Sequence, residues 1–192
     1  SPATALGAAM LDGSRKAKKA LKNNLPEYVW RAALGYKPTC YETAALCAIL
    51  SVPAETAARC TDCAEGLENR IRSMARTNPD FRELLPKVVS KRYTYARIRR
   101  VLAQNFLGID RDSALSYAHE PLYIRTLAVK KEGAEETLAA LSAGKFPLIA
   151  RKSDYSLLKK DALACFETDV RANDLYNALS GRHTGDFETM FV

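Results

Sequence analysis

The chain has 192 residues, of which 29 are lysine or arginine and 22 are aspartate or glutamate, so its formal net charge is +7. Apolar residues make up 47% and charged residues 27% of the chain, a balance that is typical of a folded globular protein and argues against intrinsic disorder. The sequence holds no run of about 18 apolar residues, which a membrane-spanning helix would need.

From residue 14 to residue 108 the signals are helical. Ser14 suits the N-cap of a basic helix, Asp62 and Glu65 have the spacing of a capping box, and Gly108 suits a C-terminal stop. Helices are predicted over 15–22, 27–34, 42–50, 53–59, from Asp62 to about Arg76, 79–86 and 94–107. Short connections between them are typical of an all-α bundle, and we expect a basic helical domain over 14–120.

After Pro121 the pattern changes to strand, helix and strand over 123–129, 132–141 and 146–150, which predicts a βαβ unit with parallel strands. Two further helices are predicted over 155–165 and 170–179. The predicted fold class is therefore mainly α, a helical bundle followed by a small βαβ unit and two further helices. We expect a small α/β appendage over 121–180 and a loose tail over 181–192.

The five cysteines are irregularly spaced and odd in number, which favours a reducing cytoplasm over a disulfide scaffold. Cys60 and Cys63 have CxxC spacing, but no second pair and no nearby histidine completes a zinc site. They do not open a helix after a strand, as a redox motif would. We interpret them as small buried residues and predict no metal site, no cofactor site and no catalytic residue in this chain.

The densest positive charge lies between residues 87 and 100, and no acidic residue occurs from 84 to 109. Arginine donors fit phosphate and tyrosine can stack on a base. The predicted RNA-contact residues are the cations and tyrosines of this segment: Lys87, Lys91, Arg92, Tyr93, Tyr95, Arg97, Arg99 and Arg100. Arg97 and Arg100 lie one helical turn apart, away from a core stripe that includes Ile98. The alternative is a basic face whose arginines pair with acids on neighbouring helices.

A second basic run, residues 15–22, holds five cations without aromatic residues, which favours a solvated helix face. Because the positive charge is concentrated in two runs, a polyanionic partner is favoured. Glu65 and Glu68 could do acid–base work, but helix capping and ion pairing with arginines explain them more simply.

Four segments together resemble one known family. They are Glu65-Gly-Leu-Glu-Asn-Arg-Ile-Arg72, Ser90-Lys-Arg-Tyr-Thr-Tyr-Ala-Arg-Ile-Arg-Arg100, Tyr123-Ile-Arg-Thr-Leu-Ala128 and Asp169-Val-Arg-Ala-Asn-Asp-Leu-Tyr176. In this order they resemble the C-terminal region of the bacterial tRNA(Met) cytidine acetate ligase family, over roughly residues 1–180. The start, Ala3-Thr-Ala-Leu6, resembles a late element of the family's catalytic domain, in which an arginine implicated in ATP binding aligns with Gly7.

The resemblance implies an enzyme that activates acetate with ATP and Mg and transfers the acetyl group to N4 of the wobble cytidine in elongator tRNA(Met). His183-Thr-Gly-Asp186 lacks the second histidine of the family's His-x-Gly-His signature. We therefore expect a chain without the N-terminal catalytic domain, in which 1–13 are the end of that domain or a linker from it. Such a chain is not expected to be catalytic alone, and ATP and acetate belong to the full-length enzyme.

In this interpretation the chain binds and positions tRNA and also contacts its own N-terminal nucleotidyltransferase domain. Tyr93 would stack on a base, whereas Tyr95 would be partly in the core, and structural ion pairing would account for Glu68 and Arg125. A structural helical domain that docks its basic stripe on the catalytic half or on a dimer partner is the alternative. A homodimer is a possible partner arrangement. A stand-alone enzyme is a third and weaker option, for which we expect no acetate-dependent ATP turnover.

Overall fold

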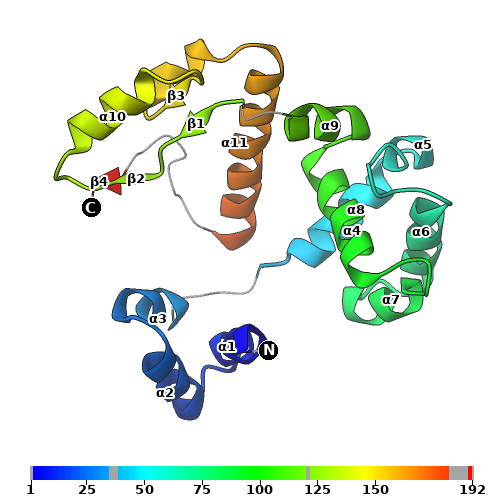
Figure 1. The fold of residues 1–192 in the computed structure, drawn as a ribbon. Helices are drawn as coiled ribbons and strands as arrows, with labels where there is room; N and C mark the ends of the chain where they lie inside the picture. The colour runs from blue at the N-terminus through cyan, green and yellow to red at the C-terminus, as the bar shows by residue number, and fades with distance from the viewer. Residues whose placement is uncertain (1, 35–38, 120–121, 182–189, 192) are drawn as a thin grey trace. The chain divides into compact units, whose positions relative to one another are not determined.

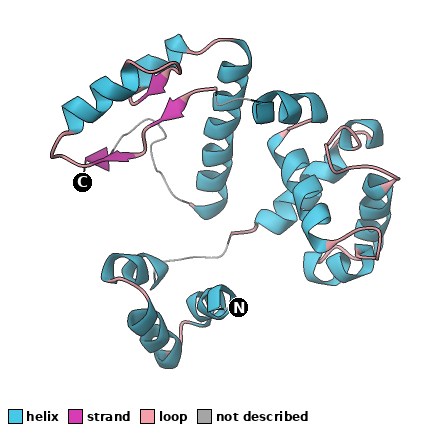
Figure 2. Cartoon of the chain, viewed as in Figure 1, coloured by secondary structure: helices cyan, strands magenta, loops and turns pink. Residues whose placement is uncertain are grey.

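The computed structural model describes residues 2–34, 39–119, 122–181 and 190–191 (Figure 1). Its secondary structure is predominantly helical with very short strands, as Figure 2 shows, so the mainly α class is confirmed. The chain divides into two compact units, Ser1–Cys40 and Tyr41–Val192. The predicted boundary between residues 120 and 121 stays a prediction.

The first unit consists of α1 (Pro2–Asp12), α2 (Arg15–Asn24) and α3 (Glu27–Leu34). Ser14 caps α2 as predicted, because its hydroxyl accepts a hydrogen bond from the Ala17 N–H at 3.1 Å. Ala17 and Leu21 lie buried on the inner face of α2. Helix α1 occupies residues that were expected to be a linker or the end of another domain.

The helical part of the second unit places four helices around one core, in which Ile49, Ile71, Leu84 and Ile98 are fully buried. Its helices are α4 (Tyr41–Ser51), α5 (Ala54–Ala57), α6 (Leu67–Thr77), α7 (Phe81–Val88), α8 (Tyr95–Leu107) and α9 (Arg111–His119). Thr94 caps α8, and Gly108 ends it with a φ of 67°. The predicted helix over 94–107 is therefore confirmed, whereas α9 was not predicted.

The capping box predicted at Asp62 is wrong, because α6 begins only at Leu67. Glu65 and Gly66 have φ values of 61° and 79°, in the left-handed region that interrupts a right-handed helix. The Asp62 carboxylate is directed instead toward α8, where it binds Arg100. A tertiary contact has therefore replaced the local one that the spacing suggested.

The α/β part contains two pairs of parallel strands. Its elements are β1 (Ile124–Arg125), β2 (Ala128–Val129), α10 (Ala134–Ser142), β3 (Leu148–Ile149), the 3-10 helix η1 (Lys152–Leu157), α11 (Lys160–Ser180) and β4 (Met190–Phe191). β1 pairs in parallel with β3, the relation predicted for 123–129 and 146–150, and α10 lies between them in the chain. β2 pairs in parallel with β4, inside the segment expected to be a loose tail; residues 182–189 of that tail lie outside the described residues.

The prediction of two separate helices over 155–165 and 170–179 is wrong, because the structure has no break between them. The first begins as η1, and a single helix of 21 residues, α11, follows. Phe166, in the first half of α11, is fully buried and packs against the rings of Tyr123 and Tyr155. This tertiary packing accounts for a helix that continues through the polar sequence where a break was expected.

Candidate nucleic-acid interface

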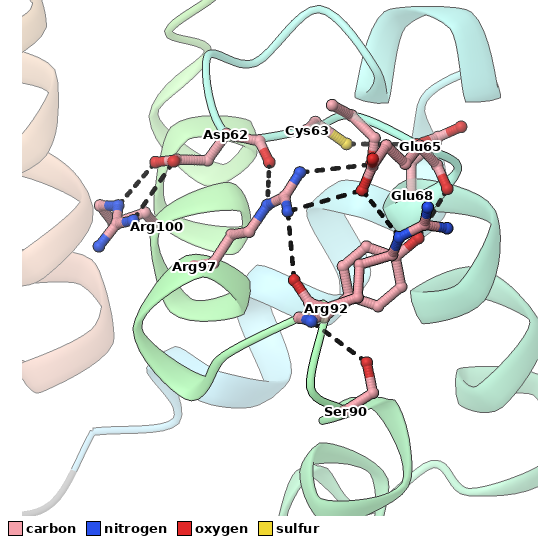
Figure 3. Close-up of polar contacts among 10 residues, drawn as sticks. Asp62, Cys63, Glu65, Glu68, Ser90, Arg92, Arg97 and Arg100 are labelled. Carbon is pink, nitrogen blue, oxygen red and sulfur yellow. Dashed lines mark hydrogen bonds and ion pairs between the residues drawn. The ribbon is translucent and has the colours of Figure 1, made fainter.

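Arg97 binds the backbone of the loop that precedes α6 (Figure 3). Its Nε donates to the Asp62 carbonyl oxygen at 2.8 Å and its Nη2 to that of Ala64 at 3.5 Å. Its Nη1 donates to the Arg92 carbonyl oxygen at 3.3 Å, and the guanidinium carbon lies 5.4 Å from the Tyr93 ring centroid. With only 22% of its side chain exposed, Arg97 joins α8 to the loop before α6, and its contact with RNA stays a prediction.

Two carboxylates from the same loop pair with the neighbouring arginines. Arg100 Nε lies 2.6 Å and its Nη2 3.3 Å from the two Asp62 carboxylate oxygens, and this hydrogen-bonded guanidinium lowers the pKa of Asp62. Arg92 Nε lies 3.0 Å from Glu65 Oε2, which is also 4.0 Å from Arg97 Nη1. We call Asp62, Glu65, Arg92, Arg97 and Arg100 the arginine cluster (Figure 3). The ion-pairing alternative describes these three arginines.

The burial expected for the two tyrosines is reversed. Tyr93 is only 7% exposed, and its hydroxyl donates to the Glu65 carbonyl oxygen at 2.6 Å, so its ring does not offer a face to a base. Tyr95 is 49% exposed. The turn before α8 explains the difference, because Ser90 and Tyr93 are hydrogen-bonded to one another and the turn directs the Tyr93 ring into the core.

Three of the predicted RNA-contact residues remain exposed without a hydrogen bond or ion pair to any described residue: Lys91, Tyr95 and Arg99. Tyr95 and Arg99 lie one turn apart on the same side of α8. Lys87 differs, since its Nζ donates to Asn78 Oδ1. We refer to Tyr95 and Arg99, with the preceding Lys91, as the α8 face.

The Glu65–Arg72 segment carries structural contacts that the sequence reasoning missed. Arg70 Nε donates to the Val88 carbonyl oxygen at 2.9 Å, and Arg72 Nη1 donates to that of Ile49 at 2.6 Å. Glu68 is buried and accepts hydrogen bonds from Cys63 Sγ at 3.3 Å and Asn69 Nδ2 at 2.8 Å. The ion pair expected for Glu68 is therefore wrong. The two arginines of the segment donate to main-chain carbonyls 18 and 23 positions away, and no local sequence pattern identifies acceptors at that distance.

Cys60 and Cys63 are 3% and 4% exposed, which confirms that they are buried residues. Burial, with the charges of nearby carboxylates, raises the pKa of Cys60 to about 11. Burial and the Glu68 carboxylate raise the pKa of Cys63 to about 12. Burial and the neighbouring carboxylates thus favour the neutral thiol at both positions.

Two pockets of ligand size lie in the α/β part. The first, which we call the β3 pocket, has a volume of about 400 Å³ and is formed where α10, β3 and η1 meet. Its lining includes the cations Lys145 and Arg151, and its one carboxylate, Asp154, already accepts the backbone N–H groups of Ala150 and Arg151. The second pocket, about 370 Å³ between η1 and α11, balances Lys152 and Arg171 with Glu167 and Asp174. The β3 pocket is therefore the better fit to a phosphate-bearing ligand.

In the part of the chain that the structure describes, the other sequence features contribute no further site. Within the described ranges, no three histidine, cysteine or acidic side chains gather to hold a metal ion. None of the helices in the described part combines the length and apolar composition needed to cross a membrane. His183 and its neighbours lie outside the described residues.

Comparisons with known proteins identify a family and a fold. The model of the family described as HIGH Nucleotidyl Transferase matches residues 1–188. The tRNA(Met) cytidine acetate ligase of Thermoanaerobacter sp. (strain X514) is 35% identical over 115 residues, covering 60% of this chain and 28% of that protein. The tRNA(Met) cytidine acetate ligase of Staphylococcus haemolyticus is 28% identical over 144 residues, covering 75% of this chain and 36% of that protein.

The same fold occurs in a solved structure. The crystal structure of Thermotoga maritima TmcAL bound with alpha-thio ATP superposes with a TM-score of 0.82 at 22% sequence identity. The superposition covers 99% of this chain and 52% of that one. The chain therefore spans about half the length of this solved relative and about a third of the curated ones it matches.

Proposed function

We infer the function of the chain from its family: it belongs to the HIGH nucleotidyl transferase family, whose model matches residues 1–188. We propose that it serves in the ATP-driven ligation of acetate to a cytidine of a tRNA. The names of its relatives support the acetate and the tRNA, and the ATP analogue in the solved relative supports ATP. The family match over nearly the whole chain is the observation that carries this proposal.

This family match corrects the interpretation drawn from the sequence. We expected a C-terminal region that lacks the nucleotidyltransferase domain and leaves all chemistry to that missing part. Because the model of the nucleotidyl transferase family itself extends over residues 1–188, that expectation is wrong. The same finding overturns the assignment of the chain as a tRNA-positioning module alone and removes the basis for excluding ATP from it.

We assign ATP to the β3 pocket on the chemistry of its lining. Lys145 and Arg151 are both exposed at this pocket, so their charges are available to the phosphates of a nucleotide. Phe146 and Leu157 supply apolar surface in the same lining, which suits the base or the ribose.

Replacing Lys145 and Arg151 together by alanine should lower the affinity for ATP at least tenfold, or by about 1.4 kcal/mol. Isothermal titration of the 192-residue chain with ATP measures this. The matched control is Lys130→Ala with Lys131→Ala, which removes two exposed cations outside the pocket. Equal losses in both double variants, or wild-type affinity in the pocket variant, would place the nucleotide elsewhere.

The tRNA part of the proposal rests on the α8 face. Lys91 and Arg99 offer cations that are not neutralised by any described carboxylate, and Tyr95 offers an exposed ring. Cations of this kind bind phosphates, and an aromatic ring can stack on an unpaired base.

Binding of elongator tRNA(Met) by the chain tests this part directly. We expect the logarithm of the dissociation constant to rise linearly with the logarithm of salt concentration, because each phosphate contact releases counterions. Fluorescence anisotropy over a range of salt concentrations measures the slope, with an unrelated RNA of the same length as the control. Absence of binding, or equal affinity for both RNAs, would contradict a specific role in handling this tRNA.

A further inference from the structure

The excess positive charge of the protein is concentrated in its first unit. Residues 1–40 hold seven lysines and arginines but only two acidic residues, and so carry +5 of the total +7. Glu27 pairs with Arg31 at 2.6 Å, and Asp12 accepts a hydrogen bond from Ser14 at 2.8 Å but forms no ion pair with a described residue. Apart from Arg31, no described cation of this unit is paired with a carboxylate of its own unit.

Most of these cations form one stripe along α2. Arg15, Lys18, Lys19 and Lys22 recur at intervals of three and four residues and are all exposed. They lie on the side of the helix opposite the buried Ala17 and Leu21. None of the four forms an ion pair with a described residue; Lys22 Nζ instead lies 4.7 Å from the centroid of the Trp30 ring. We call these four residues the α2 stripe.

The stripe is unfavourable for the isolated helix. Arg15 and Lys19, like Lys18 and Lys22, are like charges one turn apart, which repel one another. The first turn contains Arg15 but no acidic residue, so a positive charge lies at the positive end of the helix dipole. A bound polyanion would relieve both effects. The cations of the arginine cluster need no such polyanion, because they are already paired with carboxylates of the fold.

We propose that the α2 stripe is a contact surface for the phosphate backbone of the tRNA, a step that rests on the proposed function. The stripe extends over roughly 10 Å of helix, long enough to reach neighbouring phosphates of one strand. On α3, in the same unit, Tyr28 is 78% exposed and offers a ring for stacking. An anionic membrane fits less well, because the apolar face of α2 is buried within its own unit and is not free to enter lipid.

The test replaces Lys18 and Lys19 by glutamine in the full 192-residue chain. Both positions are exposed, and glutamine is compatible with a helix, so the circular dichroism spectrum should stay unchanged. We expect the affinity for tRNA at low salt to fall at least tenfold. The slope of log Kd against log salt concentration should fall by about 1.4–1.8, the change for two lost phosphate contacts.

The matched control replaces Lys130 and Lys131, two adjacent exposed lysines of the second unit, by glutamine. It should bind tRNA like the wild type. If the Lys18/Lys19 variant binds within twofold of the wild type, or if both variants weaken equally, the α2 stripe is not the contact surface while the proposed function stands. If the wild type itself fails to bind tRNA, the tRNA part of the proposed function fails together with this inference. Equal affinity of the wild type for polyglutamate would indicate docking of an acidic protein and would also overturn the inference.

Discussion

Replacing Phe166 by alanine is expected to lower the free energy of unfolding of the second unit by about 3–5 kcal/mol. The side chain is fully buried in the first half of α11. Its ring centroid lies 5.5 Å from that of Tyr123 and 5.7 Å from that of Tyr155. These contacts join the segment before β1, the 3-10 helix η1 and α11, so an alanine would leave a cavity where three elements meet.

The single tryptophan of the chain allows the unfolding of the first unit to be followed apart from that of the second. Trp30 is the only tryptophan and lies in that first unit, so its emission should keep the wild-type unfolding midpoint in denaturant. Far-ultraviolet circular dichroism should show the destabilised transition of the second unit. Tyr176→Ala is the control, because this aromatic residue of α11 is 41% exposed and should change stability by less than about 0.5 kcal/mol. A loss below about 1 kcal/mol for Phe166→Ala would contradict the packing role.

Local signals predicted those helices whose ends are determined locally. Ser14, Thr94 and Gly108 are residues with strong terminal preferences; α2 begins directly after Ser14, and α8 lies between Thr94 and Gly108. The same kind of signal failed at Asp62. Its spacing to Glu65 matches a capping box, but the carboxylate gains more from the two donors of Arg100, 38 positions further along the chain. A sequence window cannot weigh such a distant partner.

The same limit applies to the candidate interface. The sequence locates the positive charge correctly, yet the absence of acids from 84 to 109 does not leave that charge free. Asp62 and Glu65 approach from another loop and pair with Arg92 and Arg100. Residues 15–22, which were interpreted as a solvated face, receive no such carboxylates from their own unit. Whether a cation is neutralised thus depends on the tertiary fold. The sequence favoured residues 87–100 over residues 15–22 as the surface for a polyanion, and the ion pairs within the fold reverse that preference.

Arg97 and Arg99 provide the sharpest test of the proposed difference between structural and RNA-binding cations, because they are the same residue type two positions apart on α8. Arg97→Ala is expected to lower the free energy of unfolding by about 2–3 kcal/mol, since three carbonyl oxygens lose a charged donor. Arg99→Ala should change stability by less than about 0.5 kcal/mol, because the side chain is exposed and has no hydrogen bond to a described residue. Chemical denaturation followed by circular dichroism compares the two variants.

Affinity for tRNA should follow the opposite order. Arg99→Ala should reduce the slope of log Kd against log salt concentration by about 0.7–0.9, the value for one phosphate contact. Arg97→Ala, assayed well below its own unfolding midpoint, should retain the wild-type slope, because its guanidinium is already bonded to the loop before α6. A reduced slope in Arg97→Ala with unchanged stability would show that the guanidinium leaves its carbonyl acceptors to bind phosphate. In that case the arginine cluster would be an RNA-binding surface held closed by its own carboxylates, and the distinction drawn between paired and unpaired cations would not hold.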